Sequence, residues 1–146
     1  MIQKILLAYD GSTGSQAAAA AAAEIAHCFE AEVTLLTVGG PLLVAATLNN
    51  QLPRMNEHEY ERIADEGLAI LAQQQVRSHK HFVWTDPADQ ILQEARSGNY
   101  DLIVMGHRGA ATSIRSDTGL MGSVAIKVIN HAPCSIFVVR PKFEEQ

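Results

Sequence analysis

Apolar residues fall along the chain in short continuous runs, which alternate with longer segments where they recur every three or four positions. Short unbroken runs are typical of strands that are covered on both faces, as in a parallel sheet. The longer periodic segments indicate amphipathic helices. The expected strands are 2–9, 33–38, 81–85, 102–105 and 136–139.

Helix-capping residues and strong helix formers occupy the segments between these runs. Thr13 and Gln16 have the spacing of a capping box, and seven consecutive alanines follow at 17–23. Asp86 and Pro87 form a second start signal, and Gly98 closes that segment. The expected helices are 13–30, 56–76, 86–98 and 123–130, with a less readable connection at 39–54.

Alternation of strands and helices predicts the fold class. It indicates an α/β fold in which a doubly wound five-stranded parallel sheet is covered by helices on both faces. In such sheets the ligand binds outside the carboxyl ends of the strands, where the winding reverses. If the first strand lies beside the fourth, this place carries Asp10-Gly11-Ser12 and the segment from Met105 to Gly109.

Composition narrows the class of protein. A length of 146 residues, of which 47% are hydrophobic, fits one globular domain over 1–146. The net charge of −5 disfavours a nucleic-acid surface, and the chain has no apolar run long enough to span a membrane. Without a secretory leader pattern, we expect a cytoplasmic protein in which Cys28 and Cys134 are buried, reduced thiols.

A glycine-rich segment follows the fourth expected strand. Gly106, Gly109 and the helix start at Gly122-Ser123 could bring backbone N–H groups close to a phosphate. The familiar signatures G-x-x-x-x-G-K-[ST] and G-x-G-x-x-G are absent, so the segment could equally be an ordinary strand-to-helix connection.

Several ionisable residues near this place have more than one interpretation. Asp10 could accept hydrogen bonds from a ribose or adenine, help to hold Mg²⁺, or simply stabilise its own turn. His107 could carry a proton or contact phosphate, but a histidine without an evident partner is more typical of a surface. His79 and His81 lack a third ligand, so no metal site is assigned. None of these residues is assigned a catalytic role.

Four segments together resemble the universal stress protein family. They are 4–12 (KILLAYDGS), 86–91 (DPADQI), 100–106 (YDLIVMG) and 122–140, which starts Gly-Ser-Val and ends in Val-Val-Arg. The resemblance implies a sheet in the order 3-2-1-4-5 and a homodimer joined through the last strand, here 135–140. For one branch of the family it also implies ATP binding.

That branch carries the motif G-x2-G-x9-G-[ST]. Gly106 and Gly109 match its first half, but twelve residues instead of nine precede Gly122-Ser123. By resemblance, Asp10 contacts ribose or base and Val38 meets adenine through its backbone. The expected nucleotide-binding residues are Asp10, Gly11, Ser12, Val38, Met105, Gly106, His107, Arg108, Gly109, Gly122, Ser123 and Val124.

The sequence therefore predicts a cytoplasmic stress-response protein that binds ATP, ADP or AMP, with or without Mg²⁺, and acts as a dimeric sensor or regulator. No general base with a positioned partner is evident, so any hydrolysis should be slow. Two alternatives stay open: a slow ATPase or phosphotransferase that uses Asp10 or His107 in the same segment, and a nucleotide-free dimeric interaction module.

Overall fold

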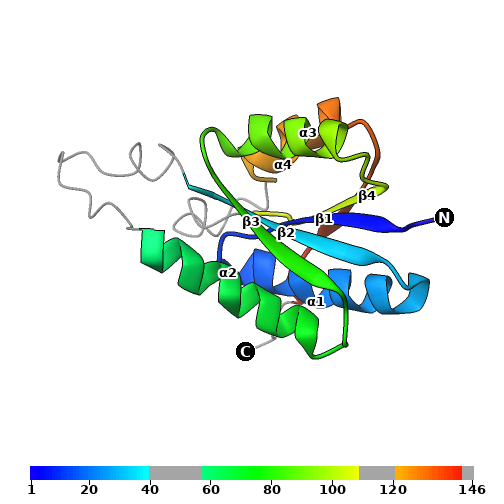
Figure 1. Cartoon of the computed structure of the whole chain (residues 1–146). Coiled ribbons are helices and arrows are strands. Elements are labelled where there is room, and N and C mark those ends of the chain that lie inside the picture. Colours follow the sequence, from blue (N-terminus) through cyan, green and yellow to red (C-terminus); the bar gives the residue numbers. More distant parts are fainter. Residues whose placement is uncertain (40–56, 109–120, 143–146) are drawn as a thin grey trace.

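The computed structural model describes residues 1–39, 57–108 and 121–142. The elements follow one another along the chain as strand and helix in strict alternation (Figure 1). They are β1 (Lys4–Ala8), α1 (Thr13–Phe29), β2 (Glu32–Gly39), α2 (Glu57–Ala72), β3 (Ser78–Trp84), α3 (Pro87–Ser97), β4 (Leu102–Gly106), α4 (Ser123–His131) and β5 (Ser135–Val139).

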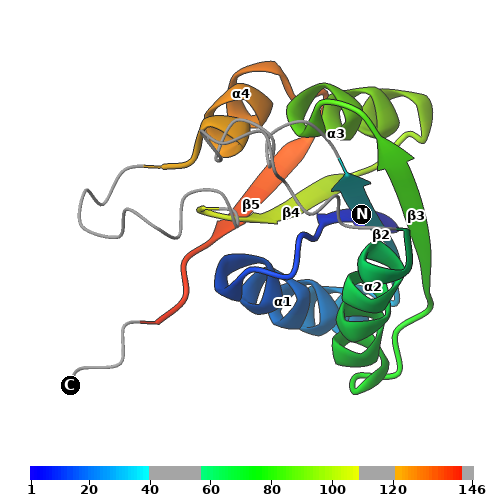
Figure 2. The ribbon, with the colours of Figure 1, turned by 90° about the vertical axis from the view of Figure 1, so that its left-hand side faces the viewer.

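The strands form one parallel sheet in the order β3-β2-β1-β4-β5. This confirms the predicted fold class and strand order. Helices α1 and α2 cover one face and α3 and α4 cover the other, as the end-on view in Figure 2 shows. The chain therefore leaves β1 toward one face of the sheet and leaves β4 toward the opposite face.

Two apolar cores lie on the two faces of the sheet. Successive residues of β1 point alternately to them: Ile5 and Leu7 pack with α1 and α2, whereas Leu6 packs with α3 and α4. The alanines of α1 bury a narrow face against the sheet, because a methyl side chain lets a helix approach closely. The fully or almost fully buried residues of that face are Ala18, Ala19, Ala22, Ala23 and Ala26.

The cap of one helix and the ends of two other elements depart most from the sequence-based expectation. Ser12, and not the box of Thr13 and Gln16, caps α1, since its hydroxyl accepts the Ser15 N–H. Helix α2 ends at Ala72, before a turn in which Gln75 takes a left-handed conformation. Strand β3 starts at Ser78 and not at 81, because pairing with the whole length of β2 extends it.

Candidate functional site

The carboxyl ends of β1 and β4 lie side by side at the centre of the sheet. The two strands pair in parallel, with Leu7 opposite Val104, so the residues that follow them leave the same edge. The winding reverses here, because β1 leads to α1 on one face and β4 leads toward α4 on the other. The switch point of a doubly wound sheet is where such folds bind ligands.

The turn after β1 is held by its own side chains. One carboxylate oxygen of Asp10 accepts the Ser12 N–H at 2.9 Å. Gly11 takes a φ of +82°, a conformation that favours glycine. The Ser15 hydroxyl donates to the Ser12 carbonyl at 3.0 Å, which fixes the first turn of α1. Asp10 therefore has the turn role that its sequence allowed, and its side chain is also exposed at the switch point.

The end of β4 passes very close to the start of α1. A Cβ atom on Gly106 would lie 2.8 Å from the Gly14 carbonyl carbon, and one on Gly14 would lie 2.7 Å from the Arg108 carbonyl oxygen. Two glycines are thus needed for one backbone to cross the other. Gly106 was expected to serve ligand approach, but this packing contact is an independent reason for its lack of a side chain.

His107 joins three elements at this edge. Its backbone N–H donates to the Val139 carbonyl, and its own carbonyl accepts the Gly122 N–H, both at 2.9 Å. Its ring nitrogen Nε2 lies 3.1 Å from Nη2 of Arg140, the residue that follows β5. The side chain is only 6% exposed, so the expectation of a surface histidine is wrong.

Electrostatics favour the neutral ring of His107. Burial, followed by the positive charges of Arg140 and Arg108, lowers its pKa below the ordinary value of histidine. A guanidinium can only donate, so Nε2 accepts and the proton of the neutral ring resides on Nδ1.

Helix α4 starts at this edge without a side-chain cap. Gly122 is its N-cap residue, and no side chain of the described residues caps the helix there. The N–H groups of the first turn have no partner within a helix, and the positive end of the helix dipole lies beside them. Gly122 is buried, Val124 is half-buried and Ser123 is exposed, so the Ser123 hydroxyl is accessible.

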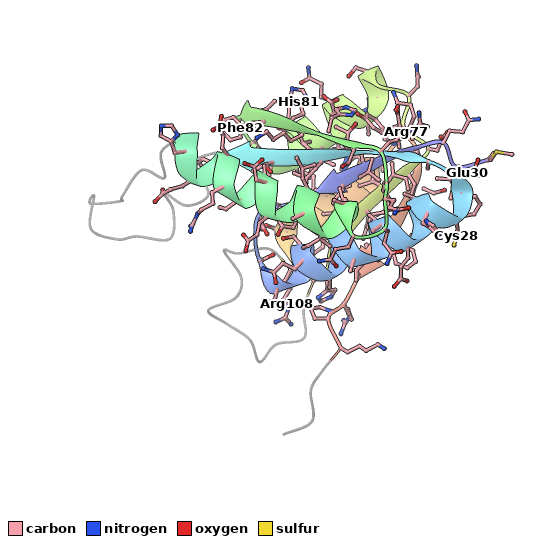
Figure 3. All side chains as sticks on the ribbon, turned by 60° about the horizontal axis from the view of Figure 1, so that its bottom comes forward. Cys28, Glu30, Arg77, His81, Phe82 and Arg108 are labelled. Atoms are coloured by element: carbon pink, nitrogen blue, oxygen red, sulfur yellow. The ribbon has the colours of Figure 1, made fainter. Side chains whose placement is uncertain are left out.

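The remaining candidates lie at the same edge but differ in what they expose. Met105 is 4% exposed and its side chain belongs to the core, so only its backbone can face a ligand. Val38 is half-buried near the end of β2 and packs against the same core. Figure 3 shows Arg108 beside the start of α1, away from Cys28 and Glu30 at its other end. Gly109 lies outside the described residues.

His79 and His81 take part in a chain of polar contacts and do not form a cluster of metal ligands. Nε2 of His79 lies 3.0 Å from the Thr34 hydroxyl, which accepts the Tyr100 hydroxyl at 2.7 Å. Nδ1 of His81 lies 3.5 Å from a carboxylate oxygen of Glu94 on α3. Across residues 1–39, 57–108 and 121–142, no three His, Cys, Asp or Glu side chains gather as metal ligands.

Two residues of the site were missed by sequence reasoning. Arg140 was expected only as the end of a strand, and its contact with His107 spans 33 positions, which no local pattern reveals. Gly14 lies in a turn-like segment rich in glycine and serine, where its sequence context gave no sign of the close contact with Arg108. The expectation of two buried cysteines was also incorrect, since Cys28 is exposed near the end of α1 and Cys134 is half-buried, both as free thiols.

No helix in the described parts of the chain has the length and apolar character needed to cross a membrane.

The doubly wound parallel sheet, with glycines and an uncapped helix start at its switch point, places this chain in the class of small open-sheet α/β proteins. Within that class the family is shown directly, because the model of the universal stress protein family matches residues 1–140. The chain belongs to the universal stress protein family.

Curated relatives agree with this membership over nearly the full length. The universal stress protein YxiE of Bacillus subtilis is 31% identical over 96% of this chain and 100% of its own. A universal stress protein of Thermus aquaticus is 34% identical, again over 96% of this chain and 100% of its own.

Solved structures show the same fold at lower identity. A universal stress protein in complex with cAMP matches 95% of this chain and 97% of its own, with a TM-score of 0.71 and 20% identity. The universal stress protein of Archaeoglobus fulgidus in complex with dAMP matches 94% of this chain and 97% of its own, with a TM-score of 0.66 and 19% identity.

Proposed function

We propose that this protein binds ATP or a related adenine nucleotide at the switch point and acts in the cytoplasm as a dimeric sensor or regulator of a stress response. The observation that carries the proposal is the start of α4. It presents first-turn N–H groups and an exposed hydroxyl, and the carbonyl of His107 fixes its position beside β4.

This helix start has the chemistry of a phosphate site. Free N–H groups and the positive end of the dipole attract an anion, and glycine at the N-cap leaves room for it. Gly122, Ser123 and Val124 would hold the phosphates, together with the backbone from Met105 to Arg108. Arg108 is half-buried in that segment and adds positive charge.

The opposite side of the switch point would hold the nucleoside. The Asp10 carboxylate is exposed there, and carboxylate oxygens suit ribose hydroxyls or, with phosphate, Mg²⁺. Gly11 and Ser12 would line the same turn, and Val38 would meet the base through its backbone. Complexes of other family members with cAMP and dAMP support an adenine nucleotide as the ligand.

The proposed dimer uses β5, an edge strand of the sheet. Phe137 on this strand is 47% exposed, an unusual degree of exposure for an aromatic residue in a sheet. An unpaired strand edge with exposed apolar side chains favours pairing with a second copy, so residues 135–140 would form the interface.

Substitution of Ser123 tests the phosphate site. Ser123→Glu places a carboxylate where the phosphate would bind, yet a negative charge in the first turn of a helix favours folding. We expect the free variant to melt no lower than the natural protein while ATP no longer raises its melting temperature. For the natural protein, ATP at about 100 times its Kd should add about 2.7 kcal/mol to the free energy of unfolding.

Ser123→Gln is the matched control, since it has almost the same shape without the charge. It should keep most of the ATP-dependent shift in melting temperature. The proposal fails if the natural protein shows no shift with ATP, ADP or AMP, with and without Mg²⁺, or if Ser123→Glu binds them as well as the control does. Mass spectrometry of small molecules released from the purified protein identifies the bound nucleotide.

A further inference from the structure

The ring of His107 makes a contact that the proposed nucleotide site does not require. Of its three bonds, the two backbone bonds would form with any residue other than proline at this position. The third joins Nε2 to Nη2 of Arg140 and depends on the imidazole alone. The ring is 6% exposed and lies beside two arginines, where a buried polar group costs free energy unless it is hydrogen-bonded.

The backbone of His107 connects this ring to the start of α4. Its carbonyl accepts the N–H of Gly122, and the carbonyl of Gly122 in turn accepts the N–H of Ile126 in α4. No side chain in the described segments caps α4, so the bond that the Gly122 N–H donates to the His107 carbonyl helps to fix where the helix begins. Anything that turns the His107 peptide therefore turns the N–H groups that would face the phosphates.

Resting on the proposed function, we propose that His107 is a positioning residue: its unprotonated Nε2, held by Arg140 at the end of β5, sets the start of α4 for nucleotide binding. Protonation of the ring removes the acceptor and places a third positive charge beside Arg140 and Arg108. The site then loosens, and nucleotide affinity falls with the loss of the bond to Arg140.

The charged groups that act on the ring are two arginines, both positive. Arg140 follows β5, and Arg108 follows the histidine itself. The first turns of α1 and α4 carry no acidic side chain. On the β1 side the ionisable group is Asp10, whose carboxylate is engaged by the Ser12 N–H. Among the described residues, the hydrogen-bond partner of the ring is Arg140.

Two amide variants distinguish the hydrogen-bond acceptor of the His107 ring from the size and burial of its side chain. The oxygen of a glutamine side chain at position 107 can reach the place of Nε2, whereas the shorter asparagine reaches only the place of Nδ1. Neither amide titrates. His107→Gln should therefore bind ATP like the natural protein at about pH 8, and His107→Asn should bind about tenfold more weakly, the value of one hydrogen bond to a charged group.

Calorimetry from about pH 8 to about pH 4.5 gives the second readout, because burial and the two arginines hold the pKa of His107 below the ordinary value of about 6.5. Toward the acid end, the affinity of the natural protein should fall by up to about tenfold more than that of His107→Gln. ATP also titrates here, but its effect is common to both proteins and cancels in their ratio. Equal pH dependence of the two proteins, or a His107→Asn variant with natural affinity at about pH 8, overturns the proposal.

NMR decides the same point without nucleotide. The ring should carry its neutral proton on Nδ1, Arg140→Ala should raise its pKa, and the Gly122 amide resonance should titrate together with the ring. A proton on Nε2, or a Gly122 amide resonance that does not shift as the ring titrates, overturns the positioning role. Absence of any nucleotide binding would refute the proposed function instead, and the Gly122 resonance would still report whether His107 controls the start of α4.

Discussion

At the scale of single residues, two buried threonines of β2 differ in whether their hydroxyl groups are hydrogen-bonded. Thr34 is 2% exposed, and its hydroxyl accepts from Tyr100 and contacts His79. Thr37 is 1% exposed, and its hydroxyl has no partner within the described part of the chain. A buried hydroxyl without a partner costs free energy, whereas a bonded one leaves its partners unsatisfied when it is removed.

Replacement of the two residues by valine should therefore have unequal effects. We expect Thr37→Val to leave the free energy of unfolding unchanged or to raise it, and Thr34→Val to lower it by about 1–3 kcal/mol. Urea denaturation of both variants measures the difference. If Thr37→Val loses as much stability as Thr34→Val, the Thr37 hydroxyl has a partner that these contacts do not include.

At the scale of elements, the start of α1 and the end of β4 pack backbone against backbone. This contact connects the turn that carries Asp10 to the segment that carries His107, because Gly14 touches Arg108 and Gly106. The two halves of the site are therefore in direct backbone contact.

Gly14→Ala should destabilise the protein although alanine is the better helix former. The new Cβ would lie 2.7 Å from the Arg108 carbonyl oxygen, so one backbone must shift. We expect a loss of about 1–3 kcal/mol in the free energy of unfolding, as for other overpacked sites. Thermal or urea denaturation measures it, and weaker ATP binding should accompany the loss.

Ala20→Gly on the exposed side of α1 is the control for helix propensity. It should cost about 1 kcal/mol. If Gly14→Ala instead stabilises the protein, propensity dominates and the close approach of α1 to β4 is not tight.

At the scale of the whole molecule, the two edge strands differ in character. The β3 edge carries His79, Lys80 and His81, all exposed. The β5 edge carries the exposed Phe137, and α4 beside it exposes Ile126 and Ile129. Charged side chains on an edge strand discourage pairing between molecules, and apolar ones favour it. The contrast supports the proposal that β5 forms the interface of the dimer.

Phe137→Glu tests this interface. A carboxylate on each copy would be desolvated or would face its equivalent across the interface, so the variant should sediment as a monomer at concentrations where the natural protein is a dimer. Phe29→Glu is a matched control, because Phe29 is also 47% exposed but lies at the end of α1. The β5 dimer is refuted if both variants keep the natural sedimentation coefficient.

Much of this architecture was evident from local patterns. Short apolar runs, the poly-alanine helix and the Asp86-Pro87 start predicted the order of elements, because burial and capping act over a few residues. Strand ends were less predictable: β3 starts three residues early because its partner β2 is long enough to pair with it. The family resemblance supplied the strand order, which periodicity alone does not specify.

The sequence by itself thus determined which segments become strands and helices and which glycines and polar residues follow β1 and β4. These are consequences of hydrophobic spacing and turn chemistry, which are local. Only the tertiary structure decided that His107 is buried, that Arg140 reaches its ring, and that Gly14 must be small for Arg108 to pass. Those contacts join residues far apart in the chain, and their existence depends on strand order and helix packing together.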